Sequence, residues 1–84
     1  MSQKDKLIAK LRTLPRDFTF DEAAVLLNAL AYEMNNKGKT SGSRVEFYRE
    51  GYPPILLHKP HPQKELKLYQ VKQLLAILDE EGLI

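Results

Sequence analysis

The apolar residues of this 84-residue chain change their spacing twice, and this change constrains the fold more than any other feature. From residue 3 to residue 31 they recur every three or four positions, as on one face of a helix. Between residues 32 and 58 they occur in short alternating or apolar runs, which are typical of strands. Helical spacing then returns and continues to residue 78. The pattern predicts helices at both ends of the chain and strands between them.

Local start and stop signals delimit three predicted helices. The first covers residues 3–14 and ends before Pro15, because proline disfavours the α conformation in the residue that precedes it. The second covers residues 20–31 and opens with the capping box that Thr19 and Glu22 form. The third begins between residues 66 and 70, and Gly82 is suited to the position that follows its last turn.

The middle of the chain is predicted to form three strands, at residues 32–35, 43–49 and 55–58. Short connections favour an antiparallel meander, and amphipathic helices would cover one face of it. We therefore expect an α+β two-layer sandwich in a single domain over residues 1–84, with its core in 20–84 and an additional helix at 3–14. Ten residues are predicted to be buried: Leu26, Leu27, Leu30, Val45, Phe47, Leu56, Val71, Leu74, Leu75 and Leu78.

Composition and charge limit the range of functions that the chain can have. The chain has no cysteine, which excludes disulfides and thiolate sites, and it has no apolar run long enough to cross a membrane. Its N-terminus lacks the apolar stretch of a secretory signal, so a cytoplasmic location is expected. Residues 35–72 carry eight basic and three acidic side chains, a local net charge of +5. This balance favours a polyanionic partner, nucleic acid above all, although an ordinary solvated strand face is the alternative.

The two histidines, His58 and His61, are the residues best suited to acid–base chemistry. They make a poor metal site, because they are three positions apart with Pro60 between them and no third ligand lies nearby in the sequence. Neither a metal nor another cofactor is therefore expected. The alternative is that one histidine ends a strand and the other is a solvated loop residue.

Several short segments, in this order and spacing, resemble the HicA toxin family: Asp21–Leu30 with Ala31–Met34, Gly42-Ser43, Leu57-His58-Lys59-Pro60-His61-Pro62, Glu65-Leu66-Lys67 and Gly82-Leu83. The resemblance implies a fold similar to a double-stranded-RNA-binding domain and a toxin of a type II toxin–antitoxin pair. Such a toxin would cleave mRNA without a metal and would be held inactive by a HicB-like antitoxin. The additional helix at 3–14 departs from the family pattern.

The family's catalytic histidine follows Gly-Ser, and this chain has Arg44 at that position. Arginine stays protonated in proteins, so it can hold a phosphate but is unsuited to act as a base. We therefore expect Arg44 to bind the scissile phosphate and His61 to take the proton from a ribose 2′-OH. The residues expected to contact RNA are Lys37, Lys39, Ser43, Arg44, Lys59 and Lys64. The alternatives are a non-catalytic module that binds RNA or an antitoxin, and an interaction domain unrelated to nucleic acid.

Overall fold

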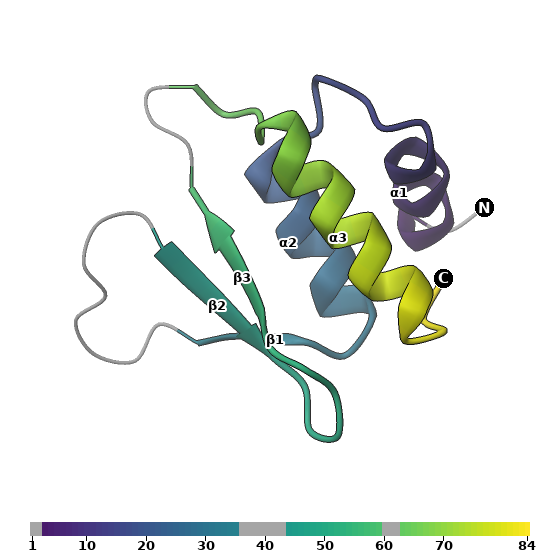
Figure 1. Ribbon diagram of the computed structural model, residues 1–84, viewed down its shortest axis with the longest axis vertical. Coiled ribbons are helices and arrows are strands. Elements are labelled where there is room, and N and C mark those ends of the chain that lie inside the picture. The colour runs from purple at the N-terminus through teal and green to yellow at the C-terminus, as the bar shows by residue number, and fades with distance from the viewer. Residues whose placement is uncertain (1–2, 36–43, 60–62) are drawn as a thin grey trace.

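The computed structural model of the chain describes residues 3–35, 44–59 and 63–84. Within these residues it contains three helices and three strands, which confirms the predicted α+β class (Figure 1). In chain order the elements are α1 (Gln3–Arg12), α2 (Phe20–Ala29), β1 (Glu33–Asn35), β2 (Arg44–Tyr48), β3 (Ile55–His58) and α3 (Leu68–Glu80).

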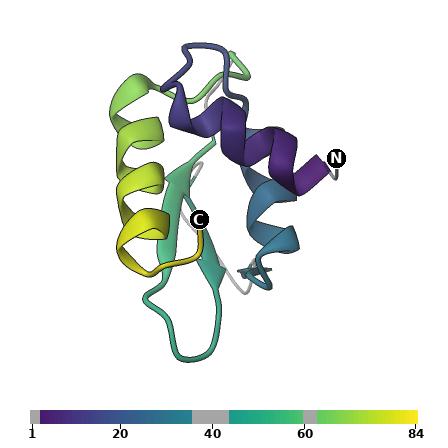
Figure 2. The same ribbon diagram turned by 90° about the vertical axis from the view of Figure 1, so that its right-hand side faces the viewer.

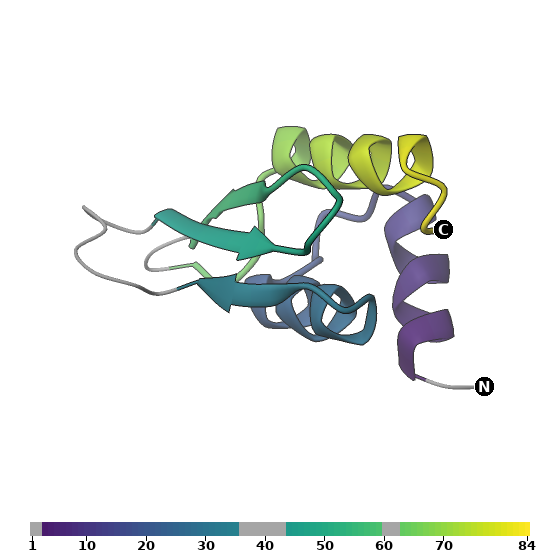
Figure 3. The same ribbon diagram turned by 90° about the horizontal axis from the view of Figure 1, so that it is seen from below.

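The three strands form one antiparallel sheet in the order β1-β2-β3, the meander that the sequence predicts. Phe47 lies at the centre of the register, opposite Met34 on one side and Ile55 on the other. Helices α2 and α3 lie side by side against one face of this sheet, and none of the three described helices lies over the opposite, open face (Figures 1 and 3). The sheet and these two helices make the two layers of the predicted sandwich.

Helix α1 packs across α2 and α3 on the side that faces away from the sheet (Figure 2). It places Leu7 and Leu11 in the core, where they are 5% and 0% exposed. The additional helix therefore adds to the core and does not lie on the open face of the sheet.

The predicted caps form. The Thr19 side chain accepts a hydrogen bond from the Glu22 N–H at 3.1 Å, and the Glu22 carboxylate accepts one from the Thr19 N–H at 3.0 Å. Gly82 follows α3 with a φ of +72°, and the Leu83 N–H donates to the Leu78 carbonyl at 2.9 Å. The start of α2 and the end of α3 thus have the caps that the sequence predicts.

Most of the predicted core is buried, and one residue is not. Leu56 is 53% exposed, because β3 alternates and turns only Ile55 and Leu57 toward the helices. The prediction of a buried Leu56 was wrong, since a run of apolar residues does not reveal which strand face lies open. Val45 and Leu75 are partly buried at the edge of the core. The other seven predicted positions are buried: Leu26, Leu27, Leu30, Phe47, Val71, Leu74 and Leu78.

Candidate functional site

The register of β2 and β3 brings Arg44 and His58 together at one end of the sheet. Arg44 is the first residue of β2, His58 is the last residue of β3, and the two are direct partners in the antiparallel ladder. The Cα atoms of directly paired residues in such a ladder lie about 5 Å apart. His58 is exposed to solvent. An arginine and a histidine are therefore neighbours on the sheet, although they are 14 positions apart in the sequence.

A short backbone pairing brings more basic residues to this end. The Phe20 N–H donates to the Lys64 carbonyl at 3.0 Å, and the Leu66 N–H donates to the Phe18 carbonyl at 2.8 Å. This pairing places Lys64 beside the first residue of α2. The ammonium group of Lys59 lies 5.9 Å from the centre of the Phe20 ring, so Lys59 reaches the same place from the end of β3. Lys59 and Lys64, which were both predicted to contact RNA, therefore lie near the start of α2.

The N-terminus of α3 adds to the positive charge here. Its N-cap residue is Lys67, no side chain caps it, and its first turn contains no acidic residue. The first N–H groups of a helix carry a partial positive charge, so an uncapped start favours anions nearby. We call Arg44, His58, Lys59, Lys64 and Lys67 the cationic end. Three of these five were predicted to contact RNA, and the remaining predicted site residues, Lys37, Lys39, Ser43 and His61, lie outside the described residues.

Sequence reasoning missed one residue that organises the cationic end. Gln70 of α3 is only 4% exposed, and its side-chain oxygen accepts a hydrogen bond from the backbone N–H of His58 at 3.2 Å. Its amide nitrogen donates to the Tyr69 hydroxyl at 3.5 Å. A signal was present, because Gln70 stands midway between Leu66 and Leu74 in an otherwise apolar four-residue repeat.

The open face of the sheet carries apolar side chains beside acidic ones. Tyr48 is 51% exposed and is the register partner of Glu33, while Leu56 is 53% exposed and is the partner of Glu46. This part of the face is acidic and apolar, whereas the cationic end is basic and polar. Such a mixed surface suits contact with a protein better than contact with a phosphate backbone.

An open groove of about 330 Å³ runs between α2 and the outer strand β1. Val25 and Met34, which are 44% and 43% exposed, contribute its apolar lining, and Tyr32 and Phe47 form part of its wall. Burial raises the pKa of the Tyr32 hydroxyl, which donates to the Pro53 carbonyl at 3.3 Å. None of the described residues that line the groove is basic, so its described lining differs chemically from the cationic end.

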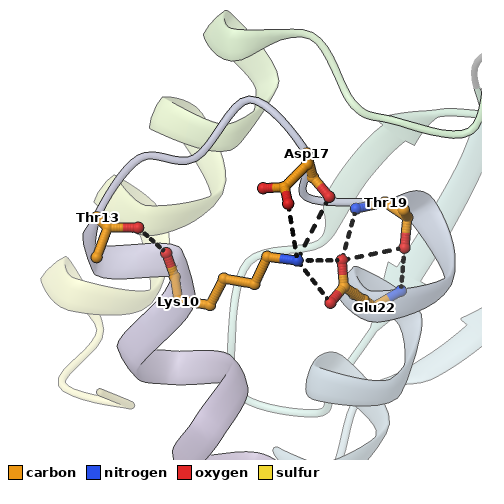
Figure 4. A network of polar contacts seen from close by, with 5 residues as sticks. All are labelled: Lys10, Thr13, Asp17, Thr19 and Glu22. Carbon is orange, nitrogen blue, oxygen red and sulfur yellow. Dashed lines mark hydrogen bonds and ion pairs between the residues drawn. The ribbon is translucent and has the colours of Figure 1, made fainter.

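A polar network ties α1 to the start of α2 (Figure 4). The Lys10 ammonium contacts the two Glu22 carboxylate oxygens at 3.0 and 2.9 Å and lies 3.8 Å from the Asp17 carboxylate. Burial works to raise the pKa of Glu22, but the hydrogen bonds from Thr19 and Lys10 outweigh it and lower that pKa. The hydrogen bond with Glu22 raises the pKa of Lys10. Both groups are therefore ionised at neutral pH, and the ion pair anchors the additional helix.

The part of the chain that the structure describes contains neither a cluster of metal ligands nor a membrane-spanning helix. No three His, Cys, Asp or Glu side chains in residues 3–35, 44–59 and 63–84 are grouped as a metal site requires. No helix in these same ranges is both long and apolar enough to span a membrane.

Comparison with known proteins gives one match. The sequence model of a family described as the HicA toxin of bacterial toxin–antitoxin systems matches residues 21–79. These residues extend from the first turn of α2 nearly to the end of α3, and they include every described residue of the cationic end. No curated protein and no solved structure matches the chain. The similarity to a double-stranded-RNA-binding domain therefore stays a prediction.

Proposed function

Since this chain belongs to the HicA toxin family of bacterial toxin–antitoxin systems, we propose that it is a toxin that cleaves mRNA in the cytoplasm without a metal ion. Membership of this family implies a cognate antitoxin partner. We propose that this partner is a HicB-like protein that holds the toxin inactive.

The observation that carries the proposal is the cationic end, above all the pairing of Arg44 with His58. A guanidinium group can hold a phosphate through two parallel hydrogen bonds, and neighbouring lysines lower the energy of charge that develops on phosphorus. The described residues supply this set from β2, from the segment that follows β3, and from the residues just before α3. Several cationic residues near one end of the sheet favour binding of a phosphodiester.

In the proposed reaction Arg44 holds the scissile phosphate, and neutral His61 takes the proton from the adjacent ribose 2′-OH. The freed 2′ oxygen attacks phosphorus and displaces the 5′ oxygen of the next nucleotide. The remaining proposed RNA contacts are Lys37, Lys39, Ser43, Lys59 and Lys64. Because lysines neutralise phosphates and release counterions, affinity for RNA is expected to fall steeply with added salt.

The test is cleavage of a purified mRNA by the purified protein in excess EDTA. The wild-type protein should cleave, Arg44→Ala should lose both binding and turnover, and His61→Ala should lose about 10²–10⁴-fold in rate. Lys4→Ala is the matched control, because this exposed lysine lies on α1, away from the cationic end. Intact mRNA after prolonged incubation with the wild-type protein would refute the proposal.

Arg44 itself favours a second candidate function, a non-catalytic module that binds RNA or the antitoxin. An arginine stands where the family has its catalytic histidine, and an arginine is a poor proton acceptor. The variant Arg44→His separates the two functions. Growth arrest that appears only with this variant, while the wild-type protein binds RNA or an antitoxin without cleavage, would favour the module.

A further inference from the structure

His58 has the three properties that a proton-transfer residue of this site needs. It is exposed to solvent, it is the direct register partner of Arg44, and it ends β3 beside Lys59. In the proposed function a phosphate binds at Arg44, which the register places directly opposite His58. Arginine and lysine side chains are poor proton donors near neutral pH, whereas imidazole gains and loses a proton there. Among the five residues of the cationic end, His58 is the one suited to proton transfer.

The structure also fixes the backbone that carries this imidazole. β3 is the outer strand on its side of the described sheet, so within residues 3–35, 44–59 and 63–84 no strand pairs with its outer edge. The N–H of His58 instead donates to Gln70, a side chain that is 4% exposed and belongs to a helix of the core. Reactive groups work best when buried neighbours hold them, because small displacements reduce the rate strongly. Gln70 is thus the positioning residue for His58.

Cleavage of RNA through its 2′-OH needs two proton transfers, and the proposed function assigns only the first. When the 2′ oxygen bonds to phosphorus, the bond from phosphorus to the 5′ oxygen breaks. The departing 5′ oxygen then needs a proton to leave as a hydroxyl. The products are a 2′,3′-cyclic phosphate and a 5′-OH, and the electrons balance without an oxidant or reductant.

Resting on the proposed function, we propose that His58 is the general acid that gives the departing 5′ oxygen its proton. Solvent returns that proton to the imidazole after each turnover. In this arrangement Arg44 holds the phosphate from β2, and His58 faces the leaving group from β3. Loss of a general acid lowers the rate by about 10²–10⁴-fold.

The experiment compares two substrates at the site that the wild-type protein cleaves fastest. The first is a short RNA with the natural linkage, and the second is the same RNA with sulfur in place of the departing 5′ oxygen. A thiolate leaves without a proton, so it does not need a general acid. His58→Ala should be at least 100-fold slower than wild type on the first RNA and within about tenfold of it on the second.

Two further variants separate catalysis from structure. Leu56→Ala is the matched control, because Leu56 is exposed at the neighbouring position on the same face of β3, and it should cleave both RNAs as wild type does. Gln70→Leu, which removes the acceptor for the His58 N–H, should slow the natural linkage more than the sulfur-substituted one. Thermal unfolding of each variant shows that the chain is folded.

The outcomes distinguish the two proposals. If the wild-type protein leaves both RNAs intact, the proposed function fails, and the role of His58 fails with it. If the wild-type protein cleaves and His58→Ala cleaves the natural linkage equally fast, only the general-acid proposal is refuted. A folded His58→Ala that is equally slow on both RNAs would also refute it, since the histidine would then act before the leaving group departs.

Discussion

The end of α2 stores strain that one substitution should release. Ala31 has a φ of +71°, a conformation that costs an L-residue with a Cβ about 1–2 kcal/mol. It is held there because the Ala31 N–H donates to Asn28 at 3.1 Å and the Tyr32 N–H donates to Leu27 at 2.9 Å. These two bonds form the same helix-ending motif that Gly82 completes after α3.

Replacing Ala31 by glycine should therefore stabilise the protein. The relief of about 1–2 kcal/mol is opposed by the extra freedom that glycine gives the unfolded chain, about 0.4–1 kcal/mol. Ala31 is exposed, so its methyl group contributes little packing. The expected net gain in the free energy of unfolding is about 0.5–1 kcal/mol. Leu14 also has a positive φ of +52°, but its side chain packs against the core and would be missed.

The assay is equilibrium unfolding in urea, with Ala29→Gly as the matched control. Ala29 is the last helical residue of α2 and is exposed, so glycine there should cost about 0.5–1 kcal/mol. The two variants remove the same methyl group two positions apart and should move the midpoint in opposite directions. If Ala31→Gly unfolds at the same urea concentration as Ala29→Gly, or below it, the argument from backbone strain is refuted.

Three further predictions concern the core and the α1 anchor. Leu74→Ala should lower the free energy of unfolding by about 2–5 kcal/mol, because Leu74 is fully buried. Leu75→Ala should lower it by only about 1–2 kcal/mol, because Leu75 is partly buried. Equal losses in urea unfolding would contradict this prediction. Leu11→Ala should also cost about 2–5 kcal/mol, and a loss below about 0.5 kcal/mol would show that α1 is not part of the cooperative core. The pKa of Glu22 is lowered in the folded chain, so its stabilisation is complete above about pH 4.3 and is lost as pH falls through the lowered value. Glu22→Gln should remove that part of the acid dependence measured by thermal unfolding.

The sequence predicted the elements better than their ends. All six predicted elements exist, because a change in apolar spacing reports on burial along each segment. The first helix ends at Arg12 and the second at Ala29, two residues before their predicted ends. In both places a residue with positive φ, Leu14 or Ala31, stops the helix without a glycine to announce it.

The site was less predictable than the fold, because it depends on strand register. A slip of one residue between β2 and β3 would move every side chain of one strand to the other face. The loop that joins them, residues 49–54, is longer than the two-residue turns that fix register, so the sequence could not pair Arg44 with His58. The role of Gln70 was hidden for a related reason. Its side-chain oxygen accepts from the N–H of His58 on the outer edge of β3. Only the packed fold shows that β3 is an outer strand of the sheet.

Helix α1, which stabilises the core, and the cationic end, which holds the proposed site, lie in different parts of the fold. The family match begins at residue 21, so α1 lies outside it, yet Leu7 and Leu11 are buried and Lys10 pairs with Glu22. Helix α1 lies on the side of α2 and α3 away from the sheet, whereas Arg44 and His58 are paired within the sheet (Figure 2). A partner bound to the open face at the paired ends of β2 and β3 would thus cover Arg44 and His58 without displacing α1. The additional helix therefore strengthens a small core from the side that lies away from the proposed site.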